Sequence, residues 1–189
     1  MALGEAILVC LTERPMSGYD LAKNFDASIG FFWRASHQQI YRELGKLREK
    51  GFVERQEISQ TGKPNRILHT ITQSGRKALY NWSKNPSRQP SIKDDLLVKL
   101  YAIEDVDQNT LIEQFSMRIE QHQSNLVKFK RIKERYYDGQ DLTINQKGKA
   151  IALEMGIVEE SSRIQWLEEI LIKIGEINQD PKGLVNPKT

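Results

Sequence analysis

The residues best suited to a chemical function lie between Ser36 and Arg66, and their side chains are of the kinds that bind nucleic acid. The amide of Gln38 can donate to and accept from adenine, and the guanidinium of Arg42 can donate twice to guanine. Lysine and arginine side chains further along the stretch can neutralise backbone phosphates. The residues that we expect to contact DNA are Ser17, Tyr19, Ser36, His37, Gln38, Gln39, Tyr41, Arg42, Lys46, Lys63 and Arg66.

A helix from Ser36 to Gly51 is needed to position the base-reading side chains. Ile40, Leu44 and Leu47 recur at i, i+4 and i+7, so one face of this helix packs on a core. The opposite face is polar, and its first two turns are the part of an inserted helix that reaches base edges in the major groove. We therefore predict a recognition helix here.

The segment after Gly51 predicts a hairpin. Two stretches with period-2 alternation are joined by turn residues from Thr61 to Asn65. The tip would place Lys63 and Arg66 against backbone phosphates. A recognition helix followed by a hairpin is typical of a winged-helix domain.

Roughly the first 85 residues resemble the DNA-binding domain of the PadR-like transcriptional regulators, in the branch with a long helical C-terminal half. The resemblance rests on ordered motifs and on the basic hairpin tip. These motifs are Met16–Leu21, Trp33, Ser36–Leu47, Gly51–Val53 and Leu68–Gly75.

The resemblance implies a transcriptional regulator, most often a repressor, that binds double-stranded DNA and responds to a small molecule or another cellular signal. A homodimer would require an inverted-repeat operator, because two copies related by a two-fold axis read two equivalent half-sites. The alternative is a winged-helix module for protein–protein contacts without DNA binding, since a fold does not determine its function.

Two local alternatives stay open at the sequence level. Arg42 could pair with Glu43 or Glu49 on a solvated helix face instead of reading a base. The segment Ser17–Tyr19 could be a capped helix start with a packed tyrosine, or it could hold a DNA phosphate at the helix N-terminus.

The C-terminal half predicts two long helices with a surplus of apolar surface. Heptad-like spacing runs from about Asp107 to Tyr137 and again from about Lys147 to Ile177, and a second stripe of Ile151, Val158 and Ile170 widens the latter. We expect this surplus surface to form a homodimer interface. The predicted interface residues are Phe115, Ile119, Ile157, Ile164, Leu167, Leu171 and Ile174.

These elements predict a mainly α fold with a small β-hairpin wing. We expect a winged helix-turn-helix DNA-binding domain over residues 1–85 and a helical dimerisation domain over residues 92–178, followed by a flexible tail over residues 179–189. The proline-containing segment Lys84–Ser91 reads as the linker.

Aromatic residues offer a possible effector site. Phe31, Phe32 and Trp33 follow one another in a connection, and Trp166 lies in the second long helix. These rings could fill gaps between helices, or they could line a pocket for a small-molecule effector.

Composition and motifs argue against an enzyme. The net charge is +3, with an excess of five basic residues in residues 1–86 and of two acidic residues in the remainder. The three histidines fall on different predicted elements and there is one cysteine, so we expect no metal site, no cofactor and no disulfide. No segment approaches the length of a membrane span and no signal peptide is evident, so we expect a cytoplasmic protein.

Overall fold

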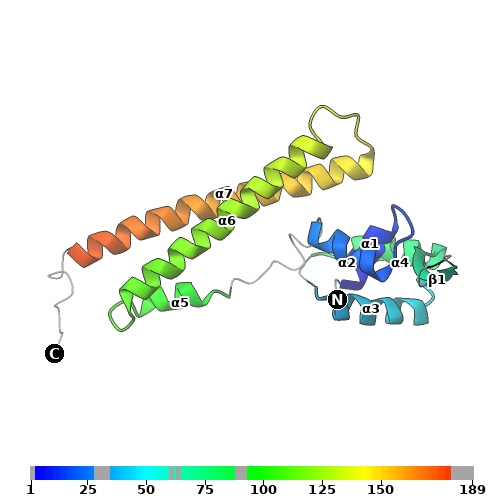
Figure 1. Ribbon diagram of the computed structural model, residues 1–189, viewed down its shortest axis with the longest axis horizontal. Coiled ribbons are helices and arrows are strands. Elements are labelled where there is room, and N and C mark those ends of the chain that lie inside the picture. The colour runs from blue at the N-terminus through cyan, green and yellow to red at the C-terminus, as the bar shows by residue number, and fades with distance from the viewer. Residues whose placement is uncertain (1–2, 28–34, 60–61, 63–64, 88–92, 180–189) are drawn as a thin grey trace. The chain divides into compact units, whose positions relative to one another are not determined.

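The computed structural model describes residues 3–27, 35–59, 62, 65–87 and 93–179. The chain divides into two compact units, Met1–Pro90 and Ser91–Thr189. The described residues form helices and a single two-stranded antiparallel sheet, which confirms the predicted mainly α fold with a small hairpin (Figure 1). Of the predicted tail, only Gln179 lies within the described residues, as the last residue of a helix.

The first unit contains three helices, a hairpin and a fourth helix. These are α1 (Leu3–Leu11), α2 (Gly18–Ala27), α3 (His37–Glu49), β1 (Val53–Ile58), β2 (Arg66–Ile71) and α4 (Gln73–Ser83). The strands pair from Val53 opposite Ile71 to Ile58 opposite Arg66. Met16, just before α2, adds an isolated bridge to His69. The start of α2 is therefore tied by backbone hydrogen bonds to the edge of the hairpin.

The core of this unit explains why α3 presents a polar face outward. Ile40, Leu44 and Leu47 are buried, as their spacing predicts. They pack in one cluster with residues of α1, α2 and both strands, including Phe25 and Ile71. Burying this apolar stripe fixes the rotation of α3 about its axis, so the opposite side of the helix must face away from the core.

A glycine allows α4 to lie close to the strand entry. A Cβ built on Gly75 would lie 2.3 Å from the carbonyl oxygen of Phe52 and 2.9 Å from Cγ1 of Ile71. The N–H of Gly75 donates to the hydroxyl of Thr72, which caps α4 and itself donates to the carbonyl of Gly51. This junction joins the end of α3, the hairpin and α4.

The second unit contains α5 (Asp95–Tyr101), α6 (Gln108–Tyr136) and α7 (Ile144–Gln179). The two long helices pack side by side (Figure 1). Leu111 and Phe115 of α6 are buried with Leu167 and Ile174 of α7. Between these helices His122 Nδ1 lies 2.6 Å from Glu160 Oε2, which adds a polar pair to an apolar contact.

Much of the main heptad stripe, which we expect to form the homodimer interface, is already packed within a single chain. Phe115, Ile119, Leu167 and Ile174 are buried inside a single chain. Ile164 and Leu171 pack against the same cluster, and Ile157 is half-buried. α6 and α7 cover one another along this stripe, because each supplies the apolar face that the other needs.

A different set of apolar residues on α7 is left exposed. Ile144, Ile151 and Val158 recur every seven residues, with Met155 between the last two, and each is more than half exposed. We call these four residues the α7 outer stripe. Within the described residues, no helix has both the length and the apolar character that crossing a membrane requires.

Candidate nucleic-acid interface

The first turn of α3 is held by a reciprocal cap. The Ser36 hydroxyl accepts from the Gln39 N–H at 3.2 Å, and Gln39 Oε1 accepts from the Ser36 N–H at 2.8 Å. Such a capping box satisfies amide groups that the start of a helix leaves free. Gln39 therefore cannot offer adenine both a donor and an acceptor while the cap is closed, which changes the role expected of it.

Gln38 and Arg42 are the other two residues of α3 that we expect to contact bases. Both are exposed and lie one turn apart. Within the described chain, Arg42 forms no ion pair with Glu43, Glu49 or another carboxylate, whereas Lys46 pairs with Glu43 at 3.0 Å. His37, the first residue of α3, is also exposed.

The start of α2 is organised around the carboxylate of Asp20. Its Oδ2 accepts from the Ser17 hydroxyl at 2.7 Å, from the Ser17 N–H at 3.1 Å and from Arg66 Nη2 at 2.5 Å. These hydrogen bonds, the Ser17 hydroxyl first and Arg66 after it, lower the pKa of Asp20 to about 2. Arg66, which the sequence assigns to phosphate, is thus already paired and ties the hairpin to α2.

Tyr41 lies against the first residue of α2. A Cβ on Gly18 would lie 2.3 Å from Cε1 of the Tyr41 ring, so this close approach depends on glycine. Tyr19 and Tyr41 nevertheless remain 62% and 52% exposed, and their hydroxyl groups can reach a ligand at this surface.

A cavity of about 500 Å³ lies between the start of α2, one side of α3 and the hairpin. It brings together four of the predicted contact residues, Ser17, Tyr19, Tyr41 and Arg66, with several that the sequence did not indicate. It does not include Gln38 or Arg42. Its lining residues are Ser17, Gly18, Tyr19, Tyr41, Leu44, Gly45, Arg48, Arg55, Asn65, Arg66, Ile67 and His69.

His69 is a cavity residue that sequence reasoning missed. It pairs across the hairpin with Arg55, and its Nδ1 is buried with no hydrogen-bond partner in the described structure. Burial lowers the pKa of His69, and the charges of Arg55 and Arg48 lower it further. Folding the two alternating segments about their turn would have placed Arg55 opposite His69, so a signal was present in the sequence.

Several predicted site residues cannot be placed at this surface. Lys63 and the aromatic residues Phe31, Phe32 and Trp33 lie outside the described residues. Trp166 is partly exposed on α7 and does not line the cavity. Among the described residues, no group of three or more His, Cys, Asp or Glu side chains is arranged to hold a metal ion.

Two family comparisons cover most of the chain. Residues 7–81 match the family described as "Transcriptional regulator PadR-like family", and residues 92–174 match "Virulence activator alpha C-term". The chain is 35% identical over 181 residues to the probable transcriptional regulator Rv1176c of Mycobacterium tuberculosis, covering 90% of this chain and 96% of that protein. It is 29% identical over 173 residues to the negative transcriptional regulator PadR of Bacillus subtilis, covering 89% of this chain and 95% of that protein.

Solved structures of similar proteins match more than nine tenths of the chain. Bacillus subtilis PadR in complex with operator DNA gives a TM-score of 0.78 at 28% identity and covers 92% of this chain and 99% of that one. The same protein in complex with p-coumaric acid gives a TM-score of 0.72 at 28% identity and covers 93% of this chain and 99% of that one. The Vibrio cholerae virulence activator AphA gives a TM-score of 0.75 at 32% identity and covers 93% of this chain and 99% of that one.

Proposed function

Because this chain belongs to the PadR-like family of transcriptional regulators, we propose that it is a homodimeric repressor that binds an inverted-repeat operator. The family is one of DNA-binding regulators and not of enzymes. The repressor assignment draws on Bacillus subtilis PadR, which is a negative regulator and has been solved with operator DNA.

The observation that supports sequence-specific binding is the free polar face at the start of α3. Gln38 and Arg42 are exposed on its first two turns, and within the described residues Arg42 has no carboxylate partner. A protein-binding surface at this place would be expected to have fewer charged residues at its centre or more exposed apolar residues. We assign base reading to Gln38 and Arg42, with His37 beside them.

The remaining residues of the interface have a different task. Lys46 and Lys63 suit phosphate contacts, as do the exposed tyrosines Tyr19 and Tyr41, whereas Arg66 is paired with Asp20 and ties the hairpin to α2. Ser17, Ser36 and Gln39 act through their caps, which hold the starts of α2 and α3 in position.

The dimer contact that we propose uses the α7 outer stripe. Exposed apolar residues at seven-residue spacing favour pairing with another helix, and a second copy of α7 offers the same stripe. A two-fold dimer would then place two copies of α3 in major grooves one helical turn, about 34 Å, or a multiple apart.

A small-molecule effector forms part of the proposal, since Bacillus subtilis PadR has been solved with p-coumaric acid. The aromatic residues Phe31, Phe32 and Trp33, together with Trp166, remain the candidates for its pocket.

The test compares base readers with a phosphate contact. The operator is first located by footprinting the DNA between this gene and its neighbours. Arg42→Ala and Gln38→Ala should each weaken operator binding by roughly 1 to 3 kcal/mol and relax the preference at particular base pairs. Lys63→Ala should weaken operator and scrambled duplex alike. Equal, sequence-independent losses for Arg42→Ala and Lys63→Ala would show that the assignment is wrong, and a wild type that binds no duplex would favour a protein-binding module.

A further inference from the structure

We propose that the cavity between α2, α3 and the hairpin is an anion pocket, in which Arg48 and Arg55 hold one backbone phosphate of bound DNA. The inference rests on the proposed DNA binding and adds a phosphate site on residues outside the predicted contact set.

The first argument is the unbalanced charge of the cavity. Three of its lining residues are arginines, and Arg66 is the one whose guanidinium is neutralised, by Asp20. Arg48 and Arg55 form no ion pair and no side-chain hydrogen bond with any described residue. Like charges gathered on one surface repel one another, and an anion between them turns repulsion into attraction.

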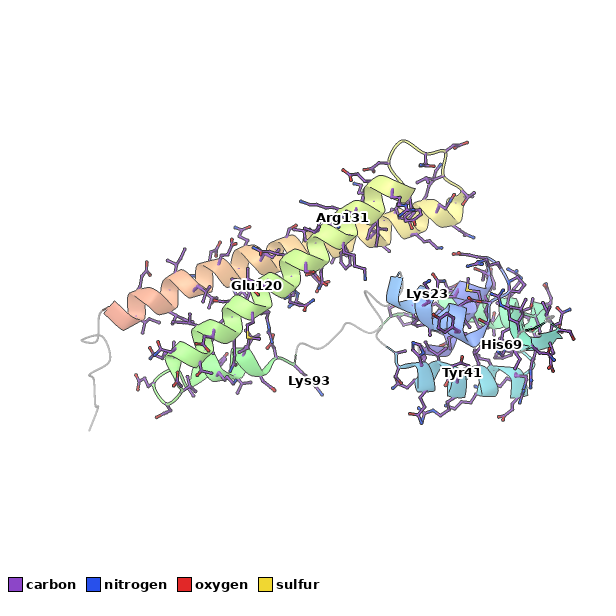
Figure 2. The ribbon with its side chains drawn as sticks, in the orientation of Figure 1. Lys23, Tyr41, His69, Lys93, Glu120 and Arg131 are labelled. Carbon is purple, nitrogen blue, oxygen red and sulfur yellow. The ribbon has the colours of Figure 1, made fainter. Side chains whose placement is uncertain are left out.

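The charges of both guanidinium groups reach His69, which lines the same cavity. Both lower the pKa of its imidazole, Arg55 more than Arg48, in addition to the larger effect of burial. Two structural features keep the residue there: its register opposite Arg55, and the backbone hydrogen bonds that it exchanges with Met16 at 2.8 and 3.1 Å. Figure 2 labels His69 at the hairpin and Tyr41 on α3, on two of the elements that form the pocket.

The start of α2 also lines the cavity, and the negative charge of Asp20 in its first turn is neutralised by Arg66. Gly18 and Tyr19 begin α2, where backbone N–H groups lack intrahelical acceptors and the helix dipole is positive. The hydroxyl groups of Tyr19 and Tyr41 add neutral donors. The cavity lining therefore offers an anion guanidinium groups together with amide and hydroxyl donors.

The position of the pocket favours a DNA phosphate over a free anion. When a recognition helix enters the major groove, the helix before it crosses the flanking backbone. Here α3 is the proposed recognition helix, and the start of α2 together with the hairpin forms the pocket. A phosphate at the edge of the groove would thus come against Arg48 and Arg55 while Gln38 and Arg42 face the bases.

The experiment couples a protein change to a DNA change. The protein variant is Arg48→Gln/Arg55→Gln, and its matched control is Arg76→Gln/Lys77→Gln, which removes two exposed charges from α4 in the same unit. Each protein is titrated with operator duplexes that carry one uncharged methylphosphonate at successive positions. Circular dichroism and thermal unfolding confirm that each variant is folded.

The pocket predicts a specific pattern. The pocket variant should bind the unmodified operator roughly tenfold or more weakly, and its salt slope should fall by about one. At one position in each half-site, the methylphosphonate should weaken DNA binding by the wild type and by the control. It should leave DNA binding by the pocket variant unchanged, because in that variant the phosphate at this position has already lost its arginine partners. If no position shows this coupling, the pocket holds no DNA phosphate.

A second arm separates a free anion from DNA. Sodium sulfate is titrated against each protein without DNA, and the melting temperature is recorded against sodium chloride at equal ionic strength. A sulfate-dependent rise that is lost in the pocket variant, without methylphosphonate coupling, would assign the cavity to a free anion and overturn the inference. A wild type that binds no duplex would instead refute the proposed function itself.

Discussion

At the scale of single residues, Asp20 joins two segments that lie far apart in the sequence. Its Oδ2 accepts from Ser17 three residues earlier and from Arg66 in the hairpin. The Ser17 hydroxyl is the largest cause of the lowered pKa, which lies at about 2 against an ordinary value of 3.8. Because the folded protein favours the ionised carboxylate, this group stabilises the fold above the ordinary pKa and ceases to do so as the pH falls through about 2.

We therefore expect Asp20→Asn to lose less stability on acidification than the wild type. Between pH 4 and pH 2 the free energy of unfolding of the wild type should fall by roughly 1 to 2 kcal/mol more than that of Asp20→Asn, after allowance for partial exposure of the ion pair. Denaturant titrations at several pH values measure the difference. Parallel pH profiles for the two proteins would show that Asp20 does not contribute in this way.

At the scale of elements, the junction of α3, the hairpin and α4 depends on the absence of a side chain at Gly75. The neighbouring atom is a backbone carbonyl oxygen of Phe52, which cannot rotate away as a side chain could. α4 must therefore move if a Cβ is added. Gly45 in α3 is the natural comparison, because a Cβ built there meets no atom within 4 Å.

Gly75→Ala should destabilise the protein by about 3 kcal/mol or more, as overpacking against a fixed backbone does. Gly45→Ala should leave stability unchanged or raise it by up to about 1 kcal/mol, because alanine favours a helix more than glycine does. Thermal and denaturant unfolding of the two variants provides the test. Equal effects would contradict the close approach at Gly75.

At the scale of the whole molecule, the two apolar faces of α7 differ in burial. Leu167 is buried against α6 within one chain, whereas Ile151 and Val158 are 68% and 58% exposed. A carboxylate at the first position should disrupt the packing of the second unit, because burying an unpaired charge costs several kcal/mol. A carboxylate in the α7 outer stripe lies mainly in solvent in a monomer, so we expect it to weaken association and leave the fold intact.

We expect Ile151→Glu/Val158→Glu to sediment as a helical monomer at micromolar concentration, where the wild type sediments as a dimer. Asn145→Glu, an exposed position that follows Ile144 and lies on another side of α7, is the control and should remain dimeric. Leu167→Glu should instead lose helical signal and melt at a lower temperature. A double variant that stays dimeric would place the interface elsewhere on the chain.

The sequence by itself determined what depends on neighbours along the chain. The helix α3 starts after Ser36 and ends before Gly51, whose φ of 69° suits glycine. The range expected for α6, about Asp107 to Tyr137, is close to the observed Gln108–Tyr136. The cap between Ser36 and Gln39 was also readable from their spacing, although Gln39 was first assigned to base reading.

The tertiary structure alone decided which surfaces and charges meet. Heptad spacing shows that α7 has apolar faces, but it does not indicate that Leu167 turns toward α6 while Ile151 turns to solvent. Arg66 and Asp20 are 46 residues apart, and no local pattern couples them. Such pairings depend on how the buried stripe of each helix fixes its rotation, and that rotation is set by the packing of all the elements of a unit together.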